Sequence, residues 1–182
     1  MRMDKDICKV MFNEVELHGA CKRLGEQITK DYEGKDLLIV GFLNGAIVFV
    51  TDLMREIDRQ INIDFMSVSS YGGGTTSSGT IHVAKDLNSD IAGRNVLIVE
   101  DILDTGNTLH QLITMLKERH PASLKVCVLL DKPARREQEI YADYVGYTIP
   151  DAFVVGYGLD YAEEYRNLPY IGVLSPSVYS HE

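Results

Sequence analysis

The clearest evidence for the fold is the stretch Val96-Leu97-Ile98-Val99-Glu100-Asp101-Ile102-Leu103-Asp104-Thr105-Gly106-Asn107-Thr108. Its four leading apolar residues are typical of a buried strand, and they run directly into the adjacent carboxylates Glu100 and Asp101. A third carboxylate, Asp104, precedes a turn that opens a helix. The next apolar residues lie on one face of that helix, at Leu109, Leu112, Ile113 and Leu116.

Strands and helices alternate outward from this stretch. Apolar residues mark one face of a helix over residues 15–30, and an apolar run predicts a strand over 36–40. Residues 41–45 are typical of a turn before a helix at about 46–55. Further strands are expected at 125–130, 144–148, 153–155 and 171–174, with half-buried strands around 61–65 and 81–83. This alternation predicts an α/β fold, with a mostly parallel sheet that binds ligands beyond the carboxyl ends of its strands.

The size and composition of the chain predict one domain over residues 1–182, with a core at about 10–168. Of its residues, 45% are hydrophobic and 25% are charged, as in ordinary globular proteins. No apolar run approaches the roughly 20 residues that cross a bilayer, and no secretory signal is recognisable. The three cysteines lack disulfide or metal-ligand spacing. We therefore expect a cytoplasmic protein that binds no membrane.

The net charge of −9 argues against a nucleic-acid partner, because such partners normally need a basic surface. It does not exclude an anionic small substrate. Backbone N–H groups of Thr105 to Thr108, at a helix start, can surround a phosphate. Glu100 and Asp101 offer acceptors to sugar hydroxyls, directly or through a divalent cation. The motif therefore predicts a site for a sugar phosphate and its metal.

The stretch also closely resembles the signature of type I phosphoribosyltransferases, which bind phosphoribosyl pyrophosphate. Other segments, in the family's order, resemble hypoxanthine-guanine phosphoribosyltransferases: Leu43-Asn44-Gly45, Ser70-Tyr71-Gly72, Leu130 to Pro133, Phe153 to Tyr161, and Tyr165-Arg166. The resemblance covers about residues 10 to 175. It implies a type I phosphoribosyltransferase-like fold, a small hood formed by the N- and C-terminal segments, and a flexible active-site lid at about 69–80.

The resemblance also implies roles for individual residues. Asp104 is expected near purine N7, as general base or hydrogen-bond partner. The phosphoribosyl site would comprise Glu100, Asp101, Asp104, Thr105, Gly106, Asn107 and Thr108. The purine site would comprise Lys132, Phe153, Val154 and Asp160. Pyrophosphate would be bound by Asn44, Gly45 and Arg166, Mg²⁺ by Glu100, Asp101 and Asp160, and the lid would begin at Ser70 and Tyr71.

In this resemblance Lys132 donates to the exocyclic O6 of the purine and Phe153 stacks on the base. Since a 6-oxo group accepts hydrogen bonds, an ammonium donor favours hypoxanthine and guanine over adenine. One departure is Asn44, because many relatives have Lys or Arg before the glycine of the pyrophosphate loop.

The expected reaction is purine salvage, in which hypoxanthine or guanine and phosphoribosyl pyrophosphate give IMP or GMP plus pyrophosphate. A xanthine-preferring enzyme is an alternative. Another is a phosphoribosyltransferase-like regulator that binds nucleic acid. Because relatives commonly form dimers or tetramers, the resemblance implies a homodimer or homotetramer.

Overall fold

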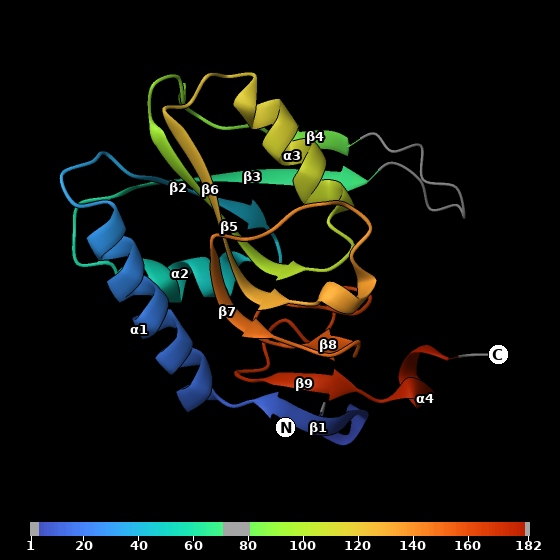
Figure 1. The fold of residues 1–182 in the computed structure, drawn as a ribbon. Coiled ribbons are helices and arrows are strands. Elements are labelled where there is room, and N and C mark those ends of the chain that lie inside the picture. Colours follow the sequence, from blue (N-terminus) through green and yellow to red (C-terminus); the bar gives the residue numbers. More distant parts are fainter. Residues whose placement is uncertain (1–3, 71–80, 181–182) are drawn as a thin grey trace.

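The chain forms two sheets, one above the other in Figure 1. The computed structural model describes residues 4–70 and 81–180. In these ranges six strands form the larger sheet, in the order β4-β3-β2-β5-β6-β7, and three form the smaller, in the order β1-β9-β8. The strands are β1 Ile7–Phe12, β2 Leu38–Leu43, β3 Asn62–Ser70, β4 Ile81–Lys85, β5 Asn95–Leu103, β6 Ser123–Asp131, β7 Tyr144–Thr148, β8 Val154–Val155 and β9 Ile171–Leu174. The helices are α1 Glu14–Asp31, α2 Ile47–Arg55, α3 Asn107–Lys117 and α4 Pro176–Tyr179, with 3-10 turns at Asp4–Asp6 and Pro133–Arg135.

Side chains that alternate along the strands of the larger sheet pack against helices on opposite faces. Those of one face, Ile39, Leu97, Val99, Cys127 and Leu129, pack in one core with α1 and α2. Those of the other face, Val40, Val96, Ile98, Val126 and Val128, pack with α3. Strands β3, β2, β5, β6 and β7 of this sheet are parallel to one another, and β4 is antiparallel to its neighbour β3. The predicted mostly parallel sheet flanked by helices is confirmed.

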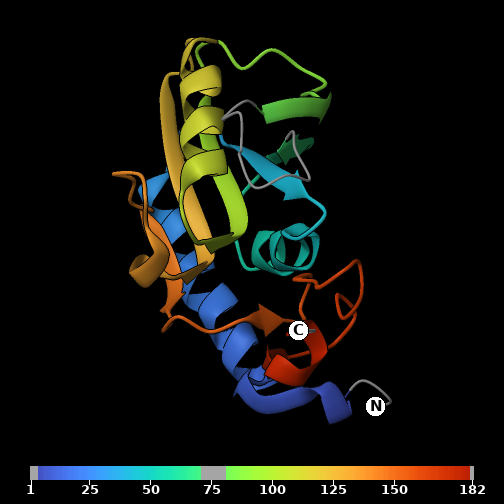
Figure 2. The same cartoon turned by 90° about the vertical axis from the view of Figure 1, so that its right-hand side faces the viewer.

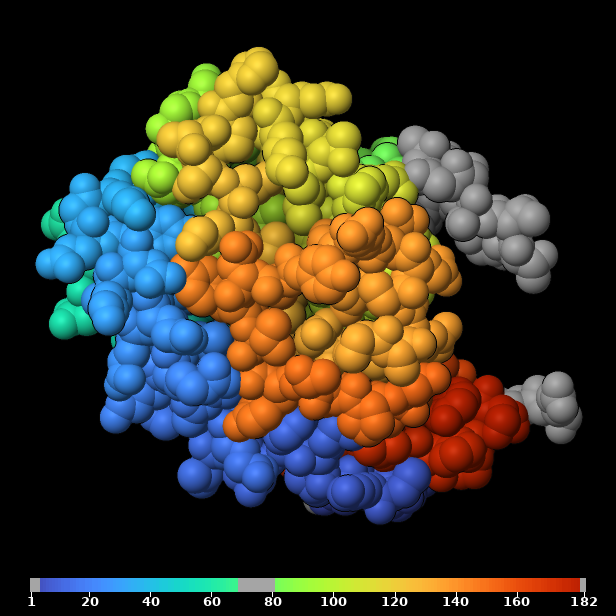
Figure 3. Space-filling view, viewed as in Figure 1, coloured from blue at the N-terminus to red at the C-terminus, as the bar shows by residue number. Residues whose placement is uncertain are grey.

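The smaller sheet joins segments from the two ends of the chain. In β1, Ile7 and Phe12 pair with Leu174 and Ile171 of the antiparallel β9. Figures 2 and 3 show the blue N-terminal segment beside the red C-terminal segment at the foot of the molecule. Sequence periodicity did not predict β1, because none of its side chains is buried and their exposure does not alternate.

Three local predictions need correction. Strand β2 continues through Leu43, so the expected turn at 41–45 is shorter. Strand β5 continues through Leu103, so Glu100 and Asp101 lie inside the strand and not beyond it. In β3, Ile63 is 37% exposed, although the half-buried strand expected around residues 61–65 would have placed this apolar side chain on its buried face. Because β3 has helices on both faces, its apolar residues do not mark a single buried face.

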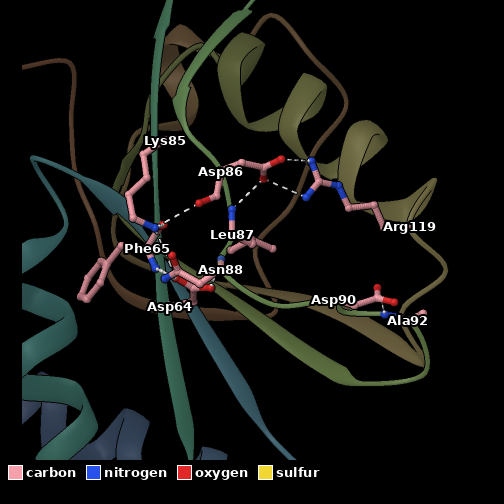
Figure 4. A network of polar contacts seen from close by, with 9 residues as sticks. All are labelled: Asp64, Phe65, Lys85, Asp86, Leu87, Asn88, Asp90, Ala92 and Arg119. Carbon is pink, nitrogen blue, oxygen red and sulfur yellow. Dashed lines mark hydrogen bonds and ion pairs between the residues drawn. The ribbon is translucent and has the colours of Figure 1, made fainter.

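A polar network explains why β3 buries Asp64, which is only 5% exposed (Figure 4). The Asp64 carboxylate accepts hydrogen bonds from the Asn88 backbone N–H at 2.6 Å and from its side-chain amide at 2.7 Å. Lys85 Nζ lies 3.4 Å away. Burial raises the pKa of Asp64, but these donors and the Phe65 N–H outweigh it and lower the pKa. The network fixes the segment after β4 to the start of β3.

The sheet grows in opposite directions from the neighbouring strands β2 and β5. Helix α2 leads from β2 to β3 on one side, and α3 leads from β5 to β6 on the other. Open sheets bind ligands at such a switch point, beyond the carboxyl ends of the strands. None of the helices in residues 4–70 and 81–180 combines the length and apolar character that a membrane span needs.

Candidate active site

A pocket of about 230 Å³ opens at the switch point. The β2–β5 pairing ends at Gly41 and Val99, before either strand ends, and the two strands then separate around the pocket. Its lining residues are Phe42, Leu43, Val68, Leu109, Leu112, Thr108 and the continuous segment Glu100 to Gly106. The pocket therefore brings together the ends of β2 and β5 with the start of α3.

Glu100 and Asp101 form an acidic pair at this pocket, in which Glu100 is half-buried and Asp101 is buried. Asp101 is 7% exposed, and its Oδ1 accepts a hydrogen bond from the Ile102 N–H at 2.7 Å. Burial and the neighbouring Asp101 charge raise the pKa of Glu100 well above its usual value. Burial also raises the pKa of Asp101, although hydrogen bonds and the Arg166 charge partly oppose this. A cation would stabilise the ionised forms of these two neighbouring carboxylates.

The loop after β2 lies directly against Asp101. A Cβ atom added at Gly45 would stand 2.0 Å from Asp101 Oδ2, and one added at Gly158 would stand 2.1 Å from the Gly45 carbonyl oxygen. Gly158 also has φ +101, a conformation that disfavours other residues. The peptide bond between Leu43 and the exposed Asn44 is cis. Only glycines allow these three segments to approach so closely.

The turn from Asp104 to Thr108 begins α3. Gly106 is the N-cap residue with φ +85, and it contributes no side-chain cap to the described helix. The Asn107 N–H donates to Thr105 Oγ1 at 3.4 Å, while the N–H groups of a helix's first turn have no acceptor within the helix itself. The Glu137 N–H donates to the Thr105 carbonyl at 2.9 Å, and Asn107 exchanges side-chain hydrogen bonds with Glu137 and Gln138. The segment after β6 thus stabilises this turn through hydrogen bonds from Glu137 and Gln138.

Asp104 and Lys132 meet because of strand register. Leu103 of β5 pairs with Asp131 of β6, so the residues that follow them are neighbours. Lys132 Nζ lies 3.1 Å from Asp104 Oδ2 and 3.8 Å from Asp151 Oδ1. Lys132 is 5% exposed, and its Nζ also approaches the Ala152 carbonyl at 3.5 Å. The other Asp104 oxygen, Oδ1, is buried and accepts no hydrogen bond from the described residues.

Arg136 is a site residue that sequence reasoning missed. Its guanidinium donates to the carbonyls of Asp104 at 3.0 Å and Leu103 at 3.2 Å, and to Ile140 at 2.7 Å. It also pairs with Asp131. Arg136 thus holds the ends of β5 and β6 together. The only sequence signal was its position soon after Lys132-Pro133, and arginines at such positions are usually surface residues.

The remaining predicted residues lie in two groups near the smaller sheet. Phe153, 40% exposed, precedes β8, and Val154 within β8 is 7% exposed and pairs with Val173. Arg166 Nη1 lies 3.0 Å from Asp160 Oδ1 and donates to the Gly158 carbonyl at 2.9 Å. The Arg166 charge also acts on Asp101, which connects this group with the acidic pair.

The predicted metal ligands do not come together in one place, and most of the predicted lid lies outside the described residues. Among the described residues, no three His, Cys, Asp or Glu side chains gather into one metal-binding group, so Glu100, Asp101 and Asp160 do not form a single cage. Ser70 is the last residue of β3. Tyr71 and the rest of the expected lid through residue 80 lie outside the described residues.

Comparisons with known proteins agree with this geometry. The model of the phosphoribosyl transferase domain matches residues 13–162. The hypoxanthine-guanine phosphoribosyltransferase of Streptococcus pneumoniae is 56% identical, over 98% of this chain and 99% of that protein. A crystal structure of a hypoxanthine phosphoribosyltransferase from Staphylococcus aureus superposes with a TM-score of 0.96 at 53% identity, covering 99% of this chain and 98% of that one.

Some relatives are much longer. The bifunctional protein TilS/HprT of Listeria monocytogenes is 54% identical over 98% of this chain, but the chain spans only 28% of that protein's length. The matched region of the domain model includes the acidic pair, the α3 turn, Lys132 and Asp160. The chain belongs to the phosphoribosyltransferase family, and within it to the group of hypoxanthine-guanine phosphoribosyltransferases.

Proposed function

We propose that this chain transfers 5-phosphoribose from phosphoribosyl pyrophosphate to N9 of hypoxanthine or guanine, giving IMP or GMP and pyrophosphate in purine salvage. The observation that carries the proposal is the Lys132–Asp104 pair, which puts a buried ammonium donor beside a carboxylate at the rim of the pocket. A donor at this place suits the O6 acceptor of a 6-oxopurine and opposes the amino group of adenine.

The acidic pair suits the sugar and a divalent cation. Burial disfavours the ionised forms of Glu100 and Asp101, and the Asp101 charge adds to this for Glu100, so bound Mg²⁺ would offset both effects. Mg²⁺ commonly takes few protein oxygens and completes its shell with substrate phosphates and water. Asp160 would help to hold a second ion beside pyrophosphate. When bound, Mg²⁺ neutralises charge that develops on the leaving pyrophosphate.

The phosphates and the leaving group have separate partners. The turn at the start of α3, with Thr105, Gly106, Asn107 and Thr108, would bind the 5′-phosphate through backbone N–H groups. Asn44, Gly45 and Arg166 would bind pyrophosphate. Arg166 is paired with Asp160 and Glu163, so it would exchange a carboxylate for phosphate oxygens, a bidentate interaction natural to arginine.

The base would lie against Phe153, with Val154 backbone groups and Asp160 near its edge. Asp104 would interact with purine N7 through Oδ1, the oxygen that has no protein donor. Ser70 and Tyr71 would start a lid that excludes water from the oxocarbenium-like transition state. The buried carboxylates near the ribose would stabilise the positive charge of that state.

A base-dependent ultraviolet assay tests the function. The purified protein, with Mg²⁺ and phosphoribosyl pyrophosphate, is given hypoxanthine, guanine, xanthine or adenine. We expect turnover of hypoxanthine or guanine and little of adenine. Turnover of xanthine alone would make the chain a xanthine enzyme, and no turnover of any of the first three would refute the proposal.

We also propose that residues 1–182 form one phosphoribosyltransferase domain that works in the cytoplasm as a homodimer or homotetramer. The free thiols of Cys8, Cys21 and Cys127 suit a reducing compartment. Light scattering after size-exclusion chromatography would test the assembly, and a monomer at micromolar concentration would contradict it.

A further inference from the structure

The exposed ring of Phe153 belongs to a cluster of three aromatic side chains. Tyr179 stacks on it, with ring centroids 5.0 Å apart and an interplanar angle of 24°. Tyr161 meets it edge-on at 5.6 Å and 86°. The two tyrosines also touch each other, at 6.3 Å and 64°. These are the favoured geometries for aromatic pairs.

The three rings come from segments separated in the chain. Phe153 precedes β8, Tyr161 lies in the turn that is bridged to Glu164, and Tyr179 ends α4. In Figures 1 and 2 the red helix α4 folds back beside the smaller sheet. The Ser175 N–H donates to the Asp6 carbonyl at 2.8 Å, and Val178 packs with Leu174 in the small core below. Strand β9 and these contacts therefore bring Tyr179 to Phe153.

A stacking ring can bind a flat base well only when it is held in one orientation. Phe153 is not enclosed by the main core, since it is 40% exposed and lies outside the two-residue strand β8. Tyr179 stacks on one face of the ring and Tyr161 packs nearly perpendicular to it, while the exposed 40% of Phe153 leaves surface for a purine. Holding the ring in advance reduces the ordering cost when the base binds.

We propose that Tyr179 is a positioning residue of the base site: its ring backs Phe153, so that the C-terminal turn forms the rear wall against which the purine stacks. The inference rests on the proposed function, because it assigns Phe153 to the base. Tyr179 does not touch the substrate in this arrangement. It acts through Phe153, and the binding of phosphoribosyl pyrophosphate does not depend on Tyr179.

Steady-state kinetics of the full chain test the proposal. Tyr179→Ala should raise KM for hypoxanthine about 3- to 10-fold, the range expected for loss of one aromatic pair. The KM for phosphoribosyl pyrophosphate and kcat should stay within about twofold. Tyr179→Phe should behave like the unaltered chain, since stacking needs the ring and not the hydroxyl. Tyr179→Leu keeps apolar bulk without a flat ring, so it should raise the KM for hypoxanthine as Tyr179→Ala does. It provides the test if Tyr179→Ala folds poorly.

Tyr141→Ala is the matched control, because Tyr141 is 79% exposed and does not belong to the cluster. It should leave both KM values unchanged. An unchanged hypoxanthine KM in folded Tyr179→Ala and Tyr179→Leu would overturn the proposal. So would a lowered KM, which would mean that Tyr179 competes with the base. Equal rises for both substrates would indicate general damage and overturn it as well. If the unaltered chain uses no 6-oxopurine, the proposed function itself fails, which is a distinguishable result.

Discussion

The Lys132 ammonium group lies 3.1 Å from Asp104, although helix α3 and strand β6 separate the two residues in the chain. Pairing of Leu103 with Asp131 puts them side by side at the carboxyl edge of the sheet. Each group satisfies the other before substrate arrives, while Asp104 Oδ1 accepts no hydrogen bond from the described residues and has Arg135 Nε 3.9 Å away. The pair is therefore poised to exchange part of its mutual interaction for contacts with a base.

Asp104→Asn should lower kcat by about 10²- to 10⁴-fold, the usual contribution of a positioned general base. Binding of both substrates should change little, because the amide keeps the size of the carboxylate. Rapid-quench or steady-state assays would measure this. Asp151→Asn is the control, since Asp151 is more exposed and lies 3.8 Å from the same ammonium group. Near-normal turnover in Asp104→Asn would rule out the catalytic assignment.

Lys132→Ala should weaken the use of 6-oxopurines much more than that of phosphoribosyl pyrophosphate. Losing a buried donor to an acceptor costs about 1–3 kcal/mol, or roughly 5- to 150-fold in kcat/KM for hypoxanthine. Discrimination against adenine should shrink at the same time. Equal losses for both substrates would show that Lys132 serves the structure and not base recognition.

The stability of the metal-free protein should fall as pH rises from about 4.5, the usual pKa of a glutamate, through the raised pKa of Glu100. The pKa of Glu100 is raised in the folded state, so the folded protein binds more protons than the unfolded chain between the two pKa values. Stability is therefore lost as pH rises through that window. Glu100→Gln should raise Tm at pH 8 and flatten the slope of Tm against pH in EDTA. Glu26→Gln, at an exposed helix position, should reproduce the parent curve; an identical curve for Glu100→Gln would contradict the assignment.

Gly45→Ala should impair binding of phosphoribosyl pyrophosphate. The new methyl group would meet Asp101 Oδ2 at 2.0 Å, so either the loop or the acidic pair must shift. We expect a rise in KM for this substrate of at least 10-fold, because misplacement by about 1 Å can cost about 100-fold. Gly19→Ala is the control, since nothing lies within 4 Å of the added atom. A normal KM in Gly45→Ala would show that the close approach has no role in binding.

Sequence reasoning predicted the larger sheet and much of the site because their signals are local. Apolar runs define β6 and β7, and the helical spacing of Leu109, Leu112 and Leu116 defines the buried face of α3. The acids of β5 and the turn before α3 are contiguous, so one segment carries the acidic pair and the phosphate turn. Errors arose where a strand is covered on both faces, as in β3, or lies at an edge, as in β1.

The amino-acid sequence alone predicts which chemical groups the protein carries and the family to which it belongs. It specifies the acids, the helix start after Gly106, and the lysine and aromatic residues of the base site. Only the tertiary structure decided which groups meet: Lys132 with Asp104, Gly45 with Asp101, Arg136 with two strand ends, and Tyr179 with Phe153. These contacts depend on strand register and on packing between distant segments, and no local pattern of residues encodes either one.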